Sequence, residues 1–210
     1  MNKKDKEKLI LELLKHKCIE FGDFKLKSGI ASPYYIDIRK LVSYPKLMDQ
    51  VATLYWSLMK KLKFDKLAGV PYAALPIAAV ISVKYNIPWV YTRKEKQSHG
   101  ITKLVQGEYE KGDKVVVIDD IITTGMSKLM VIEPLKESCL KVKDIVLLVD
   151  RENGGKEIIE KKGYKLHTAY LMSEILKLLL NKRKIDKKMF DKCLKFMERT
   201  RKDTLSKLYN

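Results

Sequence analysis

Hydrophobic positions change their spacing several times along the 210-residue chain, and each change predicts a different kind of element. Residues 6–16 carry apolar side chains at helical spacing, which predicts an amphipathic helix near the N-terminus. Residues 18–45 combine aromatic and β-branched side chains with glycines and prolines, a composition typical of short strands and turns. Helical spacing returns over residues 46–62, directly after Pro45, which suits the first turn of a helix.

Beyond residue 65, short apolar runs alternate with segments of helical pattern. The expected strands are residues 66–71, 87–92, 114–120, 144–151 and 164–171, and the expected helices are residues 74–85, the stretch after Gly125, and residues 156–163. Continuously apolar strands separated by helices predict an α/β fold with a mostly parallel sheet covered on both faces. Such a fold binds ligands beyond the carboxyl ends of its strands. Residues 173–205 predict two further helices packed back on the domain.

Two segments depart from this alternation. Pro134 lies inside the helix expected after Gly125, where it should kink or restart that helix. Residues 93–112 are long, polar and punctuated by glycine, a pattern that fits a mobile lid over a site, a disordered surface loop or a β-hairpin excursion.

Composition limits the broad class of protein. The length fits one domain with decorations, and no apolar run approaches the roughly 20 residues that a membrane span needs. The N-terminus shows no signal-peptide pattern, so a cytoplasmic protein is expected. Cys18, Cys139 and Cys193 are far apart and lack CxxC spacing, which favours reduced thiols over disulfides or a zinc site.

The formal net charge of +17 raises the question of nucleic-acid binding. Only six of the 43 basic residues are arginine, and the lysines are spread along the chain. Lysine is the weaker residue for bidentate recognition of bases or phosphates. The composition therefore favours a solvated lysine-rich surface, which can also steer small polyanions toward a site.

The segment "VVVIDDIITTGMS", residues 115–127, carries the most specific chemistry. Its apolar strand delivers Asp119 and Asp120 to the carboxyl edge of the sheet, and the small residues that follow open a helix. Backbone N–H groups in such a turn bind anions, whereas two carboxylates repel them and suit a diol. A 5-phosphorylated ribose would satisfy both halves of the motif. Neither GxGxxG nor GxxxxGK[ST] is present, so the phosphate site is of another kind.

"VVVIDDIITTG" resembles the phosphoribosyl pyrophosphate (PRPP) motif of the type I phosphoribosyltransferases. Four other stretches resemble the orotate phosphoribosyltransferases: "FGDFKLKSGIASPYYIDIR", "GVPYAALPIA", "RKEKQSHG" and "LLVDRENGG". The parts "GVPY" and "DRENGG" of these stretches are similar to the transferase half of the uridine-monophosphate synthases. The resemblance implies one domain, with an N-terminal helix and base-binding hood at 1–45, an α/β core at 46–170 that includes the lid 93–112, and C-terminal helices at 171–210.

The resemblance implies transfer of the 5-phosphoribosyl group from PRPP to N1 of orotate, which gives orotidine 5'-monophosphate and pyrophosphate. The residues implied to bind PRPP are Lys27, Tyr72, Arg93, Lys94, Lys96, His99, Asp119, Asp120, Ile121, Ile122, Thr123, Thr124, Gly125, Met126 and Ser127. The residues implied to act in catalysis are Lys96, His99, Asp119 and Asp120. The residues implied to bind orotate are Lys27, Tyr35, Ile36, Thr123 and Arg151. The implied cofactor is Mg²⁺, held mainly by PRPP, with Asp119 or Asp120 as the protein residue that can contribute an oxygen.

The implied partners are a second copy of the chain, whose lid reaches across a homodimer interface, and a separate orotidine-monophosphate decarboxylase. The family's loop lysine aligns with Gln97, while Lys96 lies one residue earlier. In an extended segment, that offset points a side chain to the opposite side. Ala73 stands where many bacterial relatives carry a lysine.

Two other functions remain open from the sequence. A purine-type phosphoribosyltransferase shares the PRPP motif, although the "LKSG" and "SPYY" stretches argue against its base pocket. A non-catalytic PRPP-binding regulator would use the +17 surface on nucleic acid, and steep salt dependence would identify it.

Overall fold

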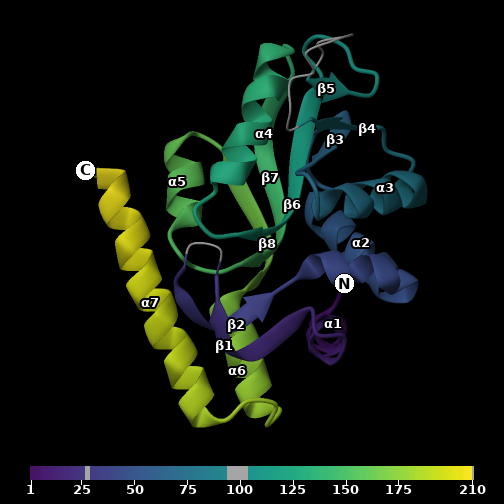
Figure 1. Cartoon of the computed structure of the whole chain (residues 1–210). Coiled ribbons are helices and arrows are strands. Elements are labelled where there is room, and N and C mark those ends of the chain that lie inside the picture. The colour runs from purple at the N-terminus through teal and green to yellow at the C-terminus, as the bar shows by residue number, and fades with distance from the viewer. Residues whose placement is uncertain (27–28, 94–103, 210) are drawn as a thin grey trace.

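A six-stranded sheet and a separate two-stranded hairpin organise the computed structural model, which describes residues 1–26, 29–93 and 104–209 (Figure 1). The strands are β1 (Ile19–Lys25), β2 (Ala31–Ile36), β3 (Lys66–Gly69), β4 (Trp89–Thr92), β5 (Val105–Gln106), β6 (Lys114–Ile122), β7 (Lys141–Asp150) and β8 (Lys165–Leu171). The central sheet has the order β5-β4-β3-β6-β7-β8. All its neighbouring strands are parallel except β4 and β5, which confirms the predicted mostly parallel sheet.

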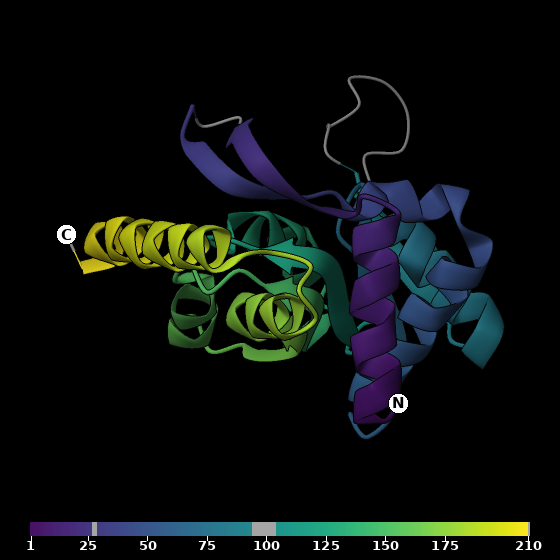
Figure 2. The same ribbon diagram turned by 90° about the horizontal axis from the view of Figure 1, so that it is seen from below.

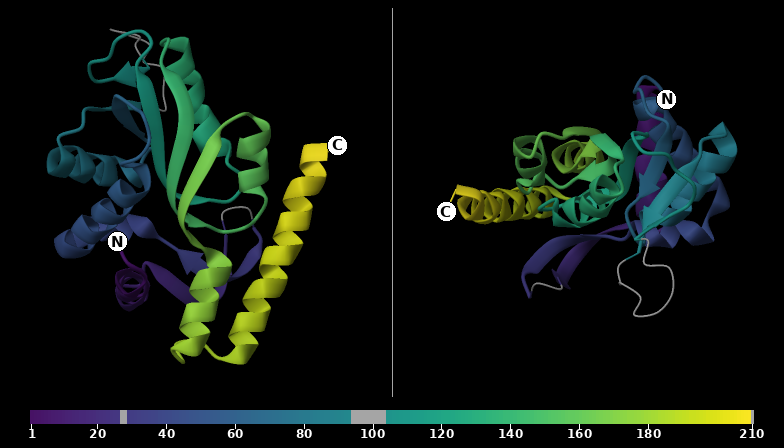
Figure 3. Two further views of the ribbon diagram at one scale, coloured as in Figure 1. Left: turned by 180° about the vertical axis from the view of Figure 1, so that it is seen from behind. Right: turned by 90° about the horizontal axis from the view of Figure 1, so that it is seen from above.

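Helices cover both faces of this sheet. They are α1 (Lys3–Lys15), the 3-10 helix η1 (Ile38–Ser43), α2 (Pro45–Met59), α3 (Ala74–Tyr85), α4 (Met126–Glu137), α5 (Gly155–Lys161), α6 (Met172–Asn181) and α7 (Lys187–Tyr209). Side chains alternate along β6: Val116 and Ile118 join the core with α2 and α3, whereas Val115 and Val117 join the core with α4 and α5. Figure 3 shows the strands between these two groups of helices. Burial on both faces explains why the strands are continuously apolar in sequence.

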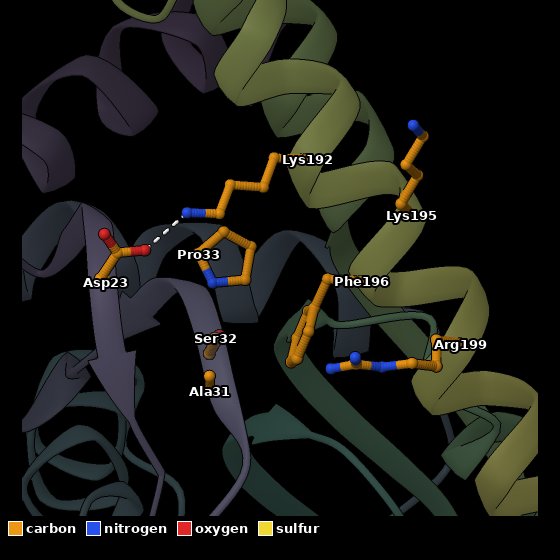
Figure 4. A pocket seen from close by; sticks show the side chains of 8 residues that line it. All are labelled: Asp23, Ala31, Ser32, Pro33, Lys192, Lys195, Phe196 and Arg199. Atoms are coloured by element: carbon orange, nitrogen blue, oxygen red, sulfur yellow. Dashed lines mark hydrogen bonds and ion pairs between the residues drawn. The ribbon is translucent and has the colours of Figure 1, made fainter.

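The β1–β2 hairpin stands off the α/β core and forms a hood, as the view from below shows (Figure 2). Helix α7 packs against the second strand of this hairpin. In Figure 4, Lys192 on α7 reaches across Pro33 to Asp23 on β1, with 2.5 Å between Nζ and Oδ1. The ring of Phe196, also on α7, meets the ring of Tyr34 edge-on at 5.6 Å between centroids. The predicted C-terminal helices therefore do pack back on the domain, and α7 supports the hood.

The sequence predicts that Pro134 kinks or restarts its helix, and the restart is not found. Helix α4 continues through Pro134 without a restart, and the proline begins its last turn. The carbonyl of Pro134 still accepts the N–H of Ser138 at 3.1 Å, so the proline removes a donor without ending the helix there.

The segment 93–112 contains β5, which pairs antiparallel with β4 at Tyr91 and Thr92. The N–H of Arg93 donates to the carbonyl of Leu104 at 3.0 Å. These bonds support the hairpin-excursion alternative at the base of the segment. Residues 94–103, which include Lys94, Lys96, Gln97 and His99, lie outside the described residues, as does Lys27.

The three cysteines are all free, as expected. None of the helices within the described ranges combines the length and apolar character needed to cross a membrane.

Candidate active site

A cavity of about 710 Å³ opens at the carboxyl ends of β3, β6 and β7, beneath the hood. Its position agrees with the edge of an α/β sheet where ligands bind. The predicted site residues that line it are Tyr35, Ile36, Tyr72, Asp119, Asp120, Ile121, Thr123, Thr124, Gly125, Met126, Ser127 and Arg151. The fold thus brings together residues that are more than 100 positions apart in sequence.

Two described residues of the predicted set do not line this cavity. Ile122 is fully buried and packs in the core beside α4 and α5, so its side chain faces away from the cavity. Arg93 lies at the base of the excursion and is exposed to solvent. The positions of Lys27, Lys94, Lys96 and His99 are outside the described part of the chain.

The turn between β6 and α4 needs glycine at position 125. Gly125 has a φ of +82°, in the left-handed region that L side chains rarely adopt. A Cβ there would also lie 2.9 Å from Cγ1 of Ile159 on α5. Glycine lets the chain turn sharply into α4, where the first backbone N–H groups of the helix have no partner within it. With the helix dipole, these groups make residues 123–127 a suitable anion site, called here the anion turn.

The two adjacent carboxylates occupy different environments. Asp119 is 4% exposed, and its Oδ1 accepts the N–H of Asp120 at 2.8 Å. Its Oδ2 lies 2.6 Å from Nζ of Lys128. Asp120 is less buried, and its Oδ1 accepts the N–H of Ile121 at 2.8 Å. The buried Tyr55 fixes the backbone here, because its hydroxyl donates to the carbonyl of Asp119 at 2.6 Å.

Burial raises the pKa of Asp120 to about 7, and the neighbouring charge of Asp119 adds to the increase. The Lys128 ammonium and the Ile121 N–H act in the opposite direction, since both favour the ionised carboxylate. The resting site therefore holds one paired carboxylate and one that gains a proton near neutral pH.

Arg151 follows β7 and is 8% exposed. Its guanidinium carbon lies 4.9 Å from the ring centroid of Tyr34, and its Nε donates weakly to the Tyr34 hydroxyl at 3.5 Å. Burial raises the pKa of Tyr34, so the phenol stays neutral, and Arg151 opposes this shift. Among the described residues, Arg151 makes no ion pair; in particular Glu152 accepts the N–H of Ser173 instead. A buried guanidinium without a carboxylate partner is suited to bind an anionic ligand.

The hood presents Tyr35 and Ile36 to the cavity from β2. Tyr35 stacks on Phe24 of β1, with 5.7 Å between ring centroids, and its hydroxyl accepts from Arg39 at 3.3 Å. Arg39 is held in turn by Asp37, with 2.7 Å between Nε and Oδ1. These contacts fix the orientation of the tyrosine that faces the site.

Two other cavities lie nearby. One of about 680 Å³ adjoins the site at Thr123, Thr124 and Arg151 and extends toward α7. The other, of about 330 Å³, lies between the hairpin and α7, and its Lys192 is already paired with Asp23 (Figure 4). Neither contains the acidic pair.

Sequence reasoning missed two residues of the site, Tyr34 and Lys128. Tyr34 sits next to the predicted Tyr35, but its role as the surface under Arg151 depends on a contact 117 residues away in sequence. Lys128 is one lysine among many, and only its position in the first turn of α4, after the acidic motif, hinted at its role.

Asp119 and Asp120 are acidic side chains of the site that could contribute oxygens to a metal ion. No group of three or more histidine, cysteine or acidic side chains gathers in the described ranges. Both acids line the cavity, but Asp119 is 4% exposed and paired with Lys128, whereas Asp120 is partly buried and is therefore the more accessible carboxylate. These residues fit a cation that takes most of its oxygens from a phosphorylated ligand.

The phosphoribosyl transferase domain matches residues 38–169, which include the acidic pair, the anion turn and Arg151. The orotate phosphoribosyltransferase of Pyrococcus furiosus is 41% identical over 172 residues, which cover 81% of this chain and 94% of that protein.

Longer proteins match as well. The bifunctional enzyme PyrF/PyrE of Nostoc sp. is 40% identical over 182 residues, which make up 87% of this chain and 38% of that protein. The solved structure of Leishmania donovani UMP synthase superposes with a TM-score of 0.84 at 40% identity, and the match covers 92% of this chain and 42% of that one. The chain thus spans about two fifths of these bifunctional relatives.

Proposed function

The chain belongs to the phosphoribosyl transferase family, among the orotate phosphoribosyltransferases, and from this premise we propose that it transfers the 5-phosphoribosyl group of PRPP to N1 of orotate. The products are orotidine 5'-monophosphate and pyrophosphate, in the route to pyrimidine nucleotides. The observation that carries the proposal is a single cavity in which the acidic pair, the anion turn and Arg151 converge, with no ion-pair partner for Arg151 among the described residues.

Each group has a distinct task in this reaction. The turn from Thr123 to Ser127 binds the 5-phosphate through backbone N–H groups and hydroxyls. The carboxylates at 119 and 120 orient the ribose diol. Arg151 pairs with the carboxylate of orotate, while Tyr35 and Ile36 of the hood line the base.

The chemistry depends mainly on positioning. As the bond between ribose C1 and pyrophosphate breaks, C1 gains oxocarbenium character and the leaving group gains negative charge. Holding the ribose at both its phosphate and its diol fixes C1 relative to N1 of the base. Cationic groups of the lid, Lys96 and His99 with Arg93 and Lys94, stabilise the departing pyrophosphate in this proposal.

We include Mg²⁺ as the cofactor. It would neutralise the pyrophosphate of PRPP, with Asp120 as the protein carboxylate best placed to contribute an oxygen. We also propose a homodimer in which the lid of one protomer serves the site of its partner. A cytoplasmic location, and association with a separate orotidine-monophosphate decarboxylase, stay predictions.

The test is a magnesium-dependent assay that mixes the protein with PRPP and follows the loss of orotate's ultraviolet absorbance together with pyrophosphate release. We expect equal consumption of orotate and release of pyrophosphate. Replacing both acids, Asp119→Asn with Asp120→Asn, should abolish PRPP binding in calorimetry while the thermal unfolding of the protein stays cooperative. Unchanged PRPP affinity in that variant would contradict the ribose assignment.

Hypoxanthine as the acceptor tests the purine alternative in the same assay. Arg151 argues against that alternative, because hypoxanthine has no carboxylate to pair with a buried guanidinium. PRPP binding without turnover on any base, together with salt-sensitive nucleic-acid binding, would instead support the regulator.

A further inference from the structure

Lys128 is a buried lysine inside the proposed PRPP site. Only 3% of it is exposed, and it lies in the first turn of α4, beside the anion turn. Its Nζ lies 2.6 Å from Oδ2 of Asp119 and 3.2 Å from the hydroxyl of Ser127, and it also donates to the carbonyl of Ile121. One ammonium group thus connects the acidic pair to the turn, with all three of its donors used.

This position is unfavourable for a lysine in two ways. Burial removes water from its charge, which is costly unless the charge is paired and hydrogen-bonded. A cation in the first turn also opposes the helix dipole. Both costs are offset here by the ion pair with Asp119, so the two side chains are energetically coupled.

The ion pair makes the two carboxylates unequal. Both oxygens of Asp119 are engaged within the protein, Oδ1 by the Asp120 N–H and Oδ2 by Lys128. Both acids line the cavity, but Asp119 is only 4% exposed whereas Asp120 is partly buried. A ribose hydroxyl therefore reaches an oxygen of Asp120 more readily than one of Asp119.

We propose that Lys128 is a positioning residue that fixes Asp119 as a buried support and thereby leaves Asp120 as the carboxylate that accepts the ribose hydroxyls of PRPP. The inference rests on the proposed function for the identity of the ligand. It goes beyond that function because it assigns different tasks to the two acids and a task to a lysine outside the acidic motif. Lys128 lines the same cavity, but in this proposal it acts through Asp119 and not by contacting PRPP.

The experiment compares Lys128→Met, Asp119→Asn, Asp120→Asn and the double variant Asp119→Asn/Lys128→Met. The matched control is Lys136→Met, an exposed lysine on the same helix that pairs with Glu133 at 3.8 Å. The dissociation constant for PRPP is measured by calorimetry, which needs no turnover, and KM is measured separately for PRPP and orotate.

We expect Lys128→Met to weaken PRPP binding at least about tenfold, because it leaves Asp119 buried without its partner. The KM for orotate should change less than about twofold, and Lys136→Met should change neither constant. Asp120→Asn should weaken PRPP binding more than Asp119→Asn. Adding Lys128→Met to Asp119→Asn should cause no further loss, since a residue that acts only through Asp119 has nothing left to position.

Three results from the single variants would overturn the inference: wild-type PRPP affinity in folded Lys128→Met, equal increases in the two KM values, or a greater loss from Asp119→Asn than from Asp120→Asn. If Lys128→Met does not fold, the double variant tests the inference instead, because it removes both charges of the ion pair and leaves neither one buried without its partner. Weaker PRPP binding in the double variant than in Asp119→Asn would mean that Lys128 contacts PRPP directly. Failure of the wild-type protein to consume orotate would count against the proposed function and not against these PRPP affinities.

Discussion

Asp120 makes the stability of the folded protein depend on pH. Burial and the adjacent Asp119 raise the pKa of Asp120 to about 7 in the folded protein, against 3.8 as its ordinary value. Between these two values the folded state binds a proton that the unfolded state has lost. The contribution of Asp120 to stability is therefore full below about pH 4 and is lost progressively as pH rises through 7.

Asp120→Asn removes this dependence while keeping the shape of the side chain. In the absence of Mg²⁺ and PRPP, we expect the melting temperature of the variant to exceed that of the wild type at pH 8 by more than at pH 5. Thermal unfolding followed by circular dichroism across this range checks the sign. A difference that shrinks toward pH 8 would mean that Asp120 is already ionised in the folded protein at low pH.

For single residues, the sequence predicted those functional roles that belong to residues adjacent in the chain. Asp119, Asp120 and the turn to Ser127 lie within one short motif, so their convergence follows from a strand that ends at a helix. Lys128 and Tyr34 could not be assigned in this way. Their roles depend on where a buried side chain points and on packing between distant segments, which no local pattern records.

Between elements, α5 approaches the turn between β6 and α4 closely. Gly155 begins α5, and a Cβ on it would lie 2.5 Å from the carbonyl oxygen of Thr123 and 2.7 Å from Cγ1 of Ile122. Any side chain at 155 must therefore push the turn between β6 and α4 away from its position.

We expect Gly155→Ala to lower stability by about 1–3 kcal/mol through overpacking and to raise the KM for PRPP. The matched control is Gly163→Ala at the other end of α5, where nothing lies within 4 Å of the added Cβ. Its φ of +86° makes alanine strained there, so stability should fall by about 1–2 kcal/mol with the KM for PRPP unchanged. Urea unfolding and initial-rate kinetics measure both; an equal change in KM for the two variants would mean that the effect is only loss of stability.

The elements themselves were largely predictable because their hydrophobic spacing is regular. The strand order was not, since β3 lies between β4 and β6 and the pairing of distant strands leaves no local signal. Pro134 does not restart α4, for a physical reason. It lies so near the end of the helix that the lost donor affects one turn and the helix needs no restart.

For the whole molecule, the proposed homodimer predicts that the lid of one protomer completes the site of its partner. The described cavity contains the side chains and the turn proposed to bind the ribose diol, the 5-phosphate and the base, whereas the proposed pyrophosphate ligands Lys96 and His99 lie in the segment 94–103. Two inactive variants can then complement each other if they impair different parts of a shared site. Lys96→Ala impairs the lid, and Asp119→Asn with Asp120→Asn impairs the ribose site.

Each variant alone should lose activity, with a loss of about 10²- to 10⁴-fold for Lys96→Ala and a much smaller one for its neighbour Gln97→Ala. When the two inactive variants are mixed in equal amounts and allowed to exchange subunits, half of the dimers are mixed, and each mixed dimer holds one site with intact acids and an intact partner lid. Orotate turnover should then recover to about a quarter of the wild-type value. If the lid serves its own protomer, every site in the mixed dimer lacks one part and no activity returns, so the recovered fraction decides between the two arrangements.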